Sequence, residues 1–212
     1  MYNNGQWTDI SGALQYTNTN IVDLNNQNVT QVWHLNKGWN WWSTYLDINL
    51  EQLETALTGN ATSITSQNGS LNYSNTYGWT GSLETFDAAR MYKIKMTEDC
   101  TVELKGRLVN ASTFQIHLNA DEDGYNWIGY PLSHKMDVNT ALKTFNPIEG
   151  DMILYRYPDG KELKSVYNAV RRGGNGAWQG TLQTLEPGCG YIYQTIQSRN
   201  VTYDYMSYGS VV

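Results

Sequence analysis

Residues 34–46 read HLNKGWNWWSTYL, and residues 117–132 read HLNADEDGYNWIGYPL. Further along, WTGSLETF at residues 79–86 is matched by WQGTLQTL at residues 178–185. The two pairs of segments occur in the same order, and chance does not explain such a pattern. The chain therefore contains an internal duplication, which is the feature that decides its organisation.

The spacing of the matched segments shows where the two copies differ in length. Trp79 and Trp178 are 99 residues apart, whereas Gly38 and Gly124 are 86 residues apart, so the second copy has gained residues between its motifs. The extra residues are rich in Gly, Asp, Arg and Lys, as expected of surface loops. We expect the following division, with the two repeats forming one joint domain: an N-terminal extension at 1–31, repeats at 32–110 and 111–205, and a tail at 206–212.

Each repeat is predicted to be mainly β. Alternate residues of a strand point to opposite faces, so Trp42 and Leu46 share one face, while Trp39 and Trp41 share the other. The residues that match Trp42 and Leu46 in the second copy are apolar too, which assigns their face to the core. Asn68-Gly69 and Asp159-Gly160 are typical hairpin turns, each following an apolar strand.

One short helix is expected in each repeat. Asn49 can cap a helix with Gln52 in the capping-box position and Gly59 as the stop. The second helix is expected to start at Asp137 and to end before Asn146-Pro147. The predicted fold class is all-β with a short helix per repeat, two halves about a pseudo-two-fold axis, a sandwich- or barrel-like shape and one joint core.

Composition excludes several classes of protein. The chain has 212 residues, a formal net charge of −6 and a pI near 5.0, which argues against nucleic-acid binding. No apolar run approaches the roughly 20 residues of a membrane span, so we expect no membrane insertion. The aromatic content, with 16 Tyr and 8 Trp against 3 Phe, consists mainly of rings with a polar edge.

Catalytic and metal-binding patterns are weak. The sequence contains no G-x-S-x-G, HExxH or P-loop motif. His34 and His117 match across the repeats and could hold a metal ion, but structural hydrogen-bonded histidines are the better interpretation. Glu149 and Asp151 resemble a glycosidase pair only if a third carboxylate meets them. We therefore expect no enzyme activity, no cofactor and no metal.

The two cysteines and the acidic run at residues 121–123 are interpreted without a functional role. Cys100 and Cys189 are too few for a disulfide framework, and we favour free thiols over a bridge. The acidic run at residues 121–123 offers oxygen ligands for calcium, but no EF-hand pattern follows, and a solvated loop is the better interpretation.

Aromatic residues are the best candidates for binding, because sugars present apolar CH faces that stack on Trp and Tyr. Aromatics matched in both repeats, such as Trp41 with Trp127, are most simply explained as core. Arg171 and Arg172 beside a glycine-rich loop are a local candidate, with a solvated hairpin tip as the alternative. The predicted ligand-binding residues are Tyr45, Tyr77, Tyr130, Tyr155, Tyr157 and Trp178.

The motifs GWNWWS at 38–43, YNWIGYPL at 125–132 and PGCGYIY at 187–193 allow a comparison with a known family. Together with the W-x-G-[ST]-L-x-T segments, they resemble the tandem "GWNWIS…WxGSLxTLxPGxGYxY" repeat of secreted and cell-surface proteins of Bacteroidetes-type bacteria. The resemblance covers residues 32–205. It implies an accessory or adhesive module and supplies no catalytic residues.

The favoured function is a non-catalytic binding or adhesion module, with a glycan as ligand. We expect an extracellular or cell-surface location with the signal peptide already removed, and a monomer. One alternative is a structural spacer or a protein-protein interaction module of a larger surface protein. Another is a phage or virion receptor-binding protein.

Overall fold

The structure is a computed structural model that describes residues 28–121, 123–169 and 176–203. Before residue 28 it describes the backbone of four short strands, which form two hairpins: β1 (Tyr2–Asn3), β2 (Gln6–Trp7), β3 (Leu14–Thr17) and β4 (Asn20–Asp23). Three sequence predictions, on Arg171, on Arg172 and on the tail at 206–212, lie outside the described residues. Among those residues, no helix is long and apolar enough to cross a membrane.

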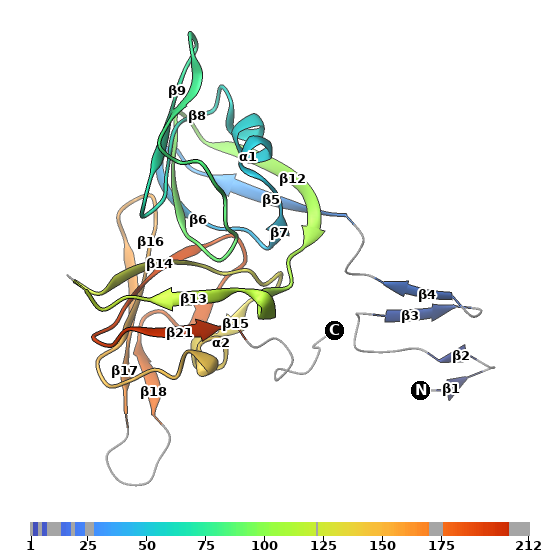
Figure 1. Cartoon of the computed structure of the whole chain (residues 1–212), viewed down its shortest axis with the longest axis vertical. Helices are drawn as coiled ribbons and strands as arrows, with labels where there is room; N and C mark the ends of the chain where they lie inside the picture. The colour runs from blue at the N-terminus through green and yellow to red at the C-terminus, as the bar shows by residue number, and fades with distance from the viewer. Residues whose placement is uncertain are drawn as a thin grey trace.

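The first repeat contains two antiparallel sheets and one helix (Figure 1). A five-stranded sheet has the order β10-β9-β8-β11-β6, and a three-stranded sheet has the order β5-β12-β7. The elements are β5 (Val29–Leu35), β6 (Gly38–Trp42), β7 (Leu46–Asp47), α1 (Leu50–Leu57), β8 (Ala61–Thr65), β9 (Ser70–Ser74), β10 (Gly78–Gly81), β11 (Tyr92–Met96) and β12 (Cys100–Leu108).

The second repeat has a five-stranded sheet of the same kind, with the order β14-β20-β16-β17-β18. Two strand pairs, β13-β21 and β15-β19, complete it. The elements are η2 (Ala111–Thr113), β13 (Gln115–Leu118), β14 (Tyr125–Gly129), β15 (Met136–Asp137), α2 (Val138–Ala141), η3 (Lys143–Phe145), β16 (Met152–Arg156), β17 (Glu162–Asn168), β18 (Ala177–Gly180), β19 (Thr184–Leu185), β20 (Gly190–Gln194) and β21 (Arg199–Thr202). The all-β fold class is confirmed.

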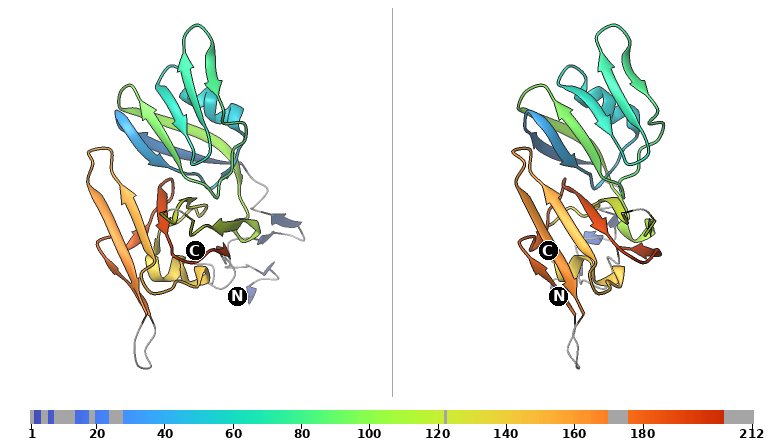
Figure 2. Two further views of the ribbon diagram at one scale, coloured as in Figure 1. Left: turned by 60° about the vertical axis from the view of Figure 1, so that its left-hand side comes forward. Right: turned by 90° about the vertical axis from the view of Figure 1, so that its left-hand side faces the viewer.

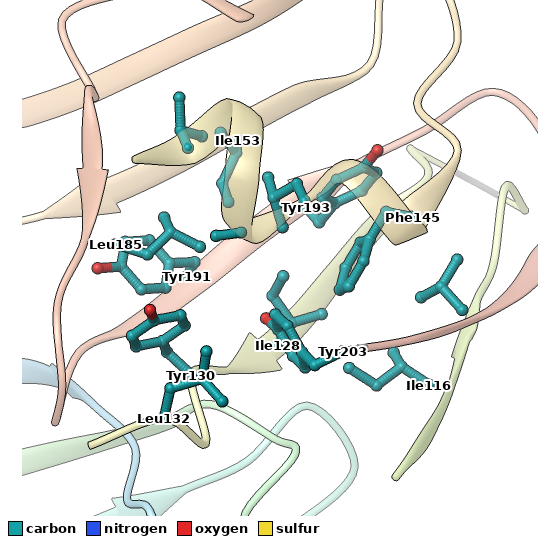
Figure 3. Packing of buried hydrophobic residues seen from close by; sticks show 14 of the residues in the cluster. Ile116, Ile128, Tyr130, Leu132, Phe145, Ile153, Leu185, Tyr191, Tyr193 and Tyr203 are labelled. Carbon is teal, nitrogen blue, oxygen red and sulfur yellow. The ribbon is translucent and has the colours of Figure 1, made fainter. Parts of the chain in front are cut away.

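The buried hydrophobic residues form two clusters, one in each half. Trp42 and Ile64 belong to the first cluster, and Ile128 and Ile153 occupy the equivalent positions in the second, which Figure 3 shows. The expected single joint core is therefore wrong. Each half has enough strands to cover its own apolar face, and the only residue from the first repeat in the second cluster is Ala89.

The asparagines of the two GxN motifs explain why the motif occurs in both halves. The Asn40 side chain accepts a hydrogen bond from Asn36 N (3.0 Å) and donates one to Asn36 O (2.7 Å). Asn126 does the same with Asn119, at 2.7 and 2.9 Å, although its loop is three residues longer. Both side chains are buried and satisfy the backbone of the preceding turn.

The remaining repeated motifs are also structural. The Gly81 and Gly180 backbones have φ angles of 155° and 153°, and an added Cβ would lie 2.0 Å from Ser70 O and 2.1 Å from Lys164 O. Only glycine fits so close to the neighbouring strand. Tyr92 and Tyr191 accept hydrogen bonds from backbone amides five residues earlier, at 2.8 and 2.7 Å.

The two halves meet at a junction with pseudo-two-fold symmetry; Figure 2 shows them one above the other. Ser43 N, just after β6, donates to Gly188 O (3.1 Å), and the equivalent Gly129 N, in the last residue of β14, donates to Ala89 O (2.7 Å). The chain segments that precede β20 and β11 therefore each pair with the other half. The expected pseudo-two-fold relation is visible in these matched backbone hydrogen bonds.

Ser43 breaks the symmetry of the junction at one point. Its hydroxyl is completely buried, donates to Cys189 O (2.6 Å) and accepts from Tyr130 N (3.0 Å). The equivalent residue in the second half is Gly129, where an added Cβ would lie 2.4 Å from Ala88 O. One half thus contributes a bridging side chain where the other has no room for one.

Candidate functional site

The outer faces of the two five-stranded sheets carry aromatic rings beside the junction. In β6, Trp42 points into the core, so Trp39 and Trp41 point outward, and in β14 the outward residues are Tyr125 and Trp127. We call these four residues the aromatic row. Its outer members, Trp39 and Tyr125, are 42% and 43% exposed. Trp127 is half-buried and Trp41 is buried.

Lys93 connects the two halves of the row. Its Nζ lies 5.2 Å from the ring centroid of Trp41 and 4.0 Å from that of Trp127. The two centroids are therefore at most about 9 Å apart, and in each half the outer ring stands two residues, about 7 Å, along its strand from the inner one. Lys95, which pairs with Trp39 across the strands, places its Nζ 5.6 Å from that ring.

The electrostatic surroundings of Lys93 are positive. Burial, followed by the nearby charge of Arg156, lowers the pKa of Lys93. Arg156 forms an exposed ion pair with Glu162, with Nε and Oε1 3.2 Å apart. In the part of the chain that the structure describes, no ion pair includes Lys93 or Lys95. Both ammonium groups are therefore placed over rings without a carboxylate partner.

The outer faces of the two repeats differ in character. By the 99-residue spacing, Lys93 and Lys95 correspond to Ile192 and Gln194. On the next strand, Thr65 of β8 pairs with Lys93, whereas Leu154 of β16 pairs with Ile192. The first repeat therefore presents a cationic and polar face, and the second presents a more apolar one.

Two side chains close the strand edges beside the row. The Gln67 amide donates to Tyr125 O and accepts from Trp127 N, both at 2.9 Å, so it occupies the free edge of β14. Beside the inner ring of the other half, the Tyr155 ring packs edge-on against Trp41, with centroids 6.5 Å apart. Tyr155 thereby buries Trp41, while Gln67 leaves Trp127 partly open.

A shallow hollow of about 400 Å³ lies where the β5–β6 turn faces the β16–β17 hairpin. Its wall includes Lys37 from the turn and Tyr157 from the hairpin. Tyr157 is 39% exposed, and the Nζ of Lys161 lies 5.8 Å from its ring centroid. The ring also packs on Tyr155, at 4.9 Å between centroids, so the hollow continues from the aromatic cluster around Trp41.

The structure separates the predicted ligand-binding residues into three groups. Tyr155 and Tyr157 lie together beside the row. Tyr45 packs half-buried against the first core, and Tyr77 is 80% exposed in the turn between β9 and β10. Tyr130 and Trp178 are buried in the second core, so we correct their assignment, because neither ring offers a face to a ligand.

The sequence prediction did not include Trp39, Tyr125, Lys93 or Lys95. The alternation of β6 already places Trp39 opposite the core, so its exposure had a signal in the sequence. Trp39 and Tyr125 match across the repeats, whereas the prediction favours aromatics that occur in one repeat only. The lysines had no signal, since their position over the rings depends on the pairing of β11 with β6.

The other candidate groups are engaged in structural contacts. His34 Nδ1 is 3.0 Å from Thr101 Oγ1, and His117 Nδ1 is 2.8 Å from Asn200 Oδ1 on the equivalent strand, which confirms hydrogen-bonded histidines. Cys100 and Cys189 are free thiols, as expected. Within the described ranges, no three His, Cys, Asp or Glu side chains gather as a metal site.

The two carboxylates considered for glycoside hydrolysis have other roles. Glu149 accepts a hydrogen bond from Ala169 N (2.6 Å). Asp151 is completely buried, forms an ion pair with Arg199 and accepts a hydrogen bond from the Tyr193 hydroxyl (2.6 Å). Neither arrangement leaves a carboxylate in an open cleft.

No family model, no curated protein and no solved structure matches the chain.

Proposed function

We propose that this protein is a non-catalytic, carbohydrate-binding module that works outside the cell or at its surface, with the aromatic row as its binding surface. The observation that carries the proposal is the row itself. Two aromatic rings more than 40% exposed, Trp39 and Tyr125, stand on the outer faces of both halves, each two residues from an inner ring at the junction. Aromatic surface gathered on one face of a protein is typical of a ligand-binding surface.

The chemistry of the row suits a sugar chain. Trp and Tyr rings provide flat apolar surfaces for the CH faces of sugars, while their polar edges remain available for hydrogen bonds. Polar side chains flank the row: half-buried Gln194 pairs with Tyr125, and half-buried Thr65 pairs with Lys93. Because the row lies on a sheet face, it favours an extended polysaccharide bound along its side over a single sugar held in a pocket.

The non-catalytic part of the proposal is supported by the carboxylates. A glycoside hydrolase needs two carboxyl groups flanking the scissile bond. Asp151 is instead occupied by Arg199 and Tyr193 in the second core, away from the solvent. The extracellular location rests on the resemblance of the GWNWWS and PGCGYIY segments to repeats of secreted proteins.

Titration of the protein with soluble polysaccharides, followed by Trp fluorescence, tests the proposal. We expect a saturable change with one polysaccharide class. Trp39→Ala and Tyr125→Ala should each weaken binding about tenfold, because each removes one exposed stacking surface. Tyr77→Ala is the matched control, since it removes an exposed ring from a hairpin turn outside the row.

Two outcomes would overturn the proposal. Equal loss of binding in Tyr77→Ala and Trp39→Ala would mean that the row is not the site. No binding to any polysaccharide would favour the structural spacer or a module that binds another protein.

A further inference from the structure

Lys93 and Lys95 stand on the aromatic face of an acidic protein, and no ion pair among the described residues gives either an acidic partner. The chain has 20 Asp and Glu against 14 Lys and Arg. Even so, the described ion pairs use four arginines and leave these two lysines out. A local positive patch on a negatively charged protein is a feature that attracts an anionic ligand.

The rings and the strand pairing fix the positions of both ammonium groups. Lys93 and Lys95 are alternate residues of β11, so they point to the same face as the aromatic row. The Trp127 ring lies 4.0 Å from the Nζ of Lys93, and the Trp39 ring lies 5.6 Å from that of Lys95. A ligand that stacks on these rings would therefore pass directly beside two positive charges.

No ion pair of the described residues gives Lys93 a counter-charge of its own. Burial and the charge of Arg156 both disfavour the charged form of Lys93 and lower its pKa, and the described carboxylate beside them, Glu162, is paired with Arg156. A negatively charged ligand would supply the missing counter-charge. The second repeat has Ile192 and Gln194 at the matching positions, so the charge belongs to one half of the row only.

We propose that the ligand of the aromatic row is an anionic polysaccharide, whose carboxylate or sulfate groups contact Lys93 and Lys95 while its sugar rings stack on Trp39 and Trp127. This inference rests on the proposed function and adds the ligand's charge. Single-stranded nucleic acid also combines negative charge with stacking. Two lysines disfavour it, because proteins that bind nucleic acid present a longer basic stripe along the phosphate backbone.

A pair of polysaccharides that differ only in charge provides the test. We would titrate the protein with polygalacturonate and with its methyl-esterified, uncharged form. We expect polygalacturonate to bind at least tenfold more tightly at low salt. That preference should shrink in about 1 M salt, where charges are screened beyond about 3 Å. Single-stranded DNA serves as the third ligand.

The residues of the second repeat at the matching positions suggest which substitutions to test. Lys95→Gln and Lys93→Ile introduce the residues found at the matching positions, so both side chains are compatible with this fold. Lys95 is exposed, and Lys95→Gln should weaken polygalacturonate binding about fivefold while leaving binding of the ester unchanged. Lys105→Gln is the matched control, because it removes an exposed charge from β12, in the other sheet of the same repeat.

The outcomes separate this inference from the proposed function. Equal binding of the acid and the ester would leave a carbohydrate-binding module standing and overturn its preference for anions. Equal losses in Lys95→Gln and Lys105→Gln would overturn the role of the row's lysines. Tighter binding of single-stranded DNA than of polygalacturonate would also overturn the inference. No binding to either polysaccharide would overturn the proposed function itself.

Discussion

Asn126 is a buried side chain whose hydrogen bonds satisfy the backbone of the turn that precedes β14. Its amide makes hydrogen bonds with both backbone groups of Asn119, and its Nδ2 also lies 2.8 Å from Gly124 O. We expect Asn126→Ala to destabilise the protein by about 2 to 3 kcal/mol, because it leaves buried backbone groups unpaired. Urea unfolding measures the loss, and the exposed Asn75→Ala should change stability by less than about 0.5 kcal/mol.

Asp151 is the only acidic residue among the buried polar residues of the described chain. We expect Asp151→Asn to cost about 3 to 5 kcal/mol, because Arg199, only 15% exposed, would lose its counter-charge. Asp47→Asn is the control, since it breaks the exposed pair with Arg107 and should cost at most about 1 kcal/mol. Similar losses in the two variants would contradict the structural role of Asp151. Thermal unfolding of both proteins makes the comparison.

At the residue scale, the sequence predicted which face of a strand each side chain occupies better than it predicted which side chains form the binding surface. Strand alternation correctly placed Trp42 and Leu46 in the core. It also separated Trp39 and Trp41 from them, but repetition in both halves was interpreted as burial. That interpretation holds for Trp178 and fails for Trp127, which is half-buried on the outer face. A motif can be repeated because the backbone needs part of it, while the other residues face solvent.

At the scale of elements, local signals were reliable. The capping box of Asn49 and Gln52 is present, and α1 ends before Gly59, whose φ is 84°. The Asn68-Gly69 and Asp159-Gly160 turns join antiparallel strands. The second helix is shorter than expected: α2 gives way to a 3-10 turn that ends at Asn146, which has a left-handed φ of 47°. Pairings of distant segments, such as β7 with β12, had no local signal.

At the scale of elements, the glycine of each W-x-G motif provides a test of how closely neighbouring strands approach. Gly180→Ala would place a Cβ 2.1 Å from Lys164 O and force β17 and β18 apart. Gly150→Ala is the control, because its φ of 85° is also positive but the space around it is open. We expect the control to cost about 1 to 2 kcal/mol and Gly180→Ala to cost at least twice as much. Chemical denaturation separates the two, and equal costs would contradict the close approach of the strands.

At the scale of the whole molecule, the duplication was readable from the sequence, but the way the halves join was not. The junction includes backbone hydrogen bonds, such as Ser43 N to Gly188 O, which carry little side-chain signal. Two separate cores follow, because the halves share strand ends rather than an apolar face. The candidate site was missed in part for the same reason: Lys93 reaches Trp127 only across this junction.

Both cores contain groups that resist ionisation, which predicts loss of stability in alkali. Burial raises the pKa of Tyr92 to about 12 and that of Cys189 to about 11, from ordinary values of 10.0 and 9.0. Between the ordinary and the raised pKa values, the unfolded chain loses protons that the folded chain retains. Stability is therefore full below about pH 9 and decreases as the pH rises towards about 12.

Urea unfolding at about pH 8 and about pH 10.5 measures this effect. Each group contributes up to about 3 kcal/mol at the upper end of the range. Cys189→Ala removes one ionisable group, so its stability should fall less steeply with pH. A denaturation midpoint that stays constant over this range would contradict the burial of these groups.

The junction, in which each half pairs with a segment of the other, has a consequence for how such a chain could arise. Two separate single-repeat chains could form the same backbone contacts across a true symmetry axis, as an isologous homodimer. In that dimer the residue at the position of Ser43 and Gly129 would have to be identical in both subunits. Gly129 has no room for a side chain, so an ancestral pair would carry glycine twice. Gene fusion lifts that constraint, and the buried Ser43 hydroxyl is an asymmetry that two identical subunits cannot encode.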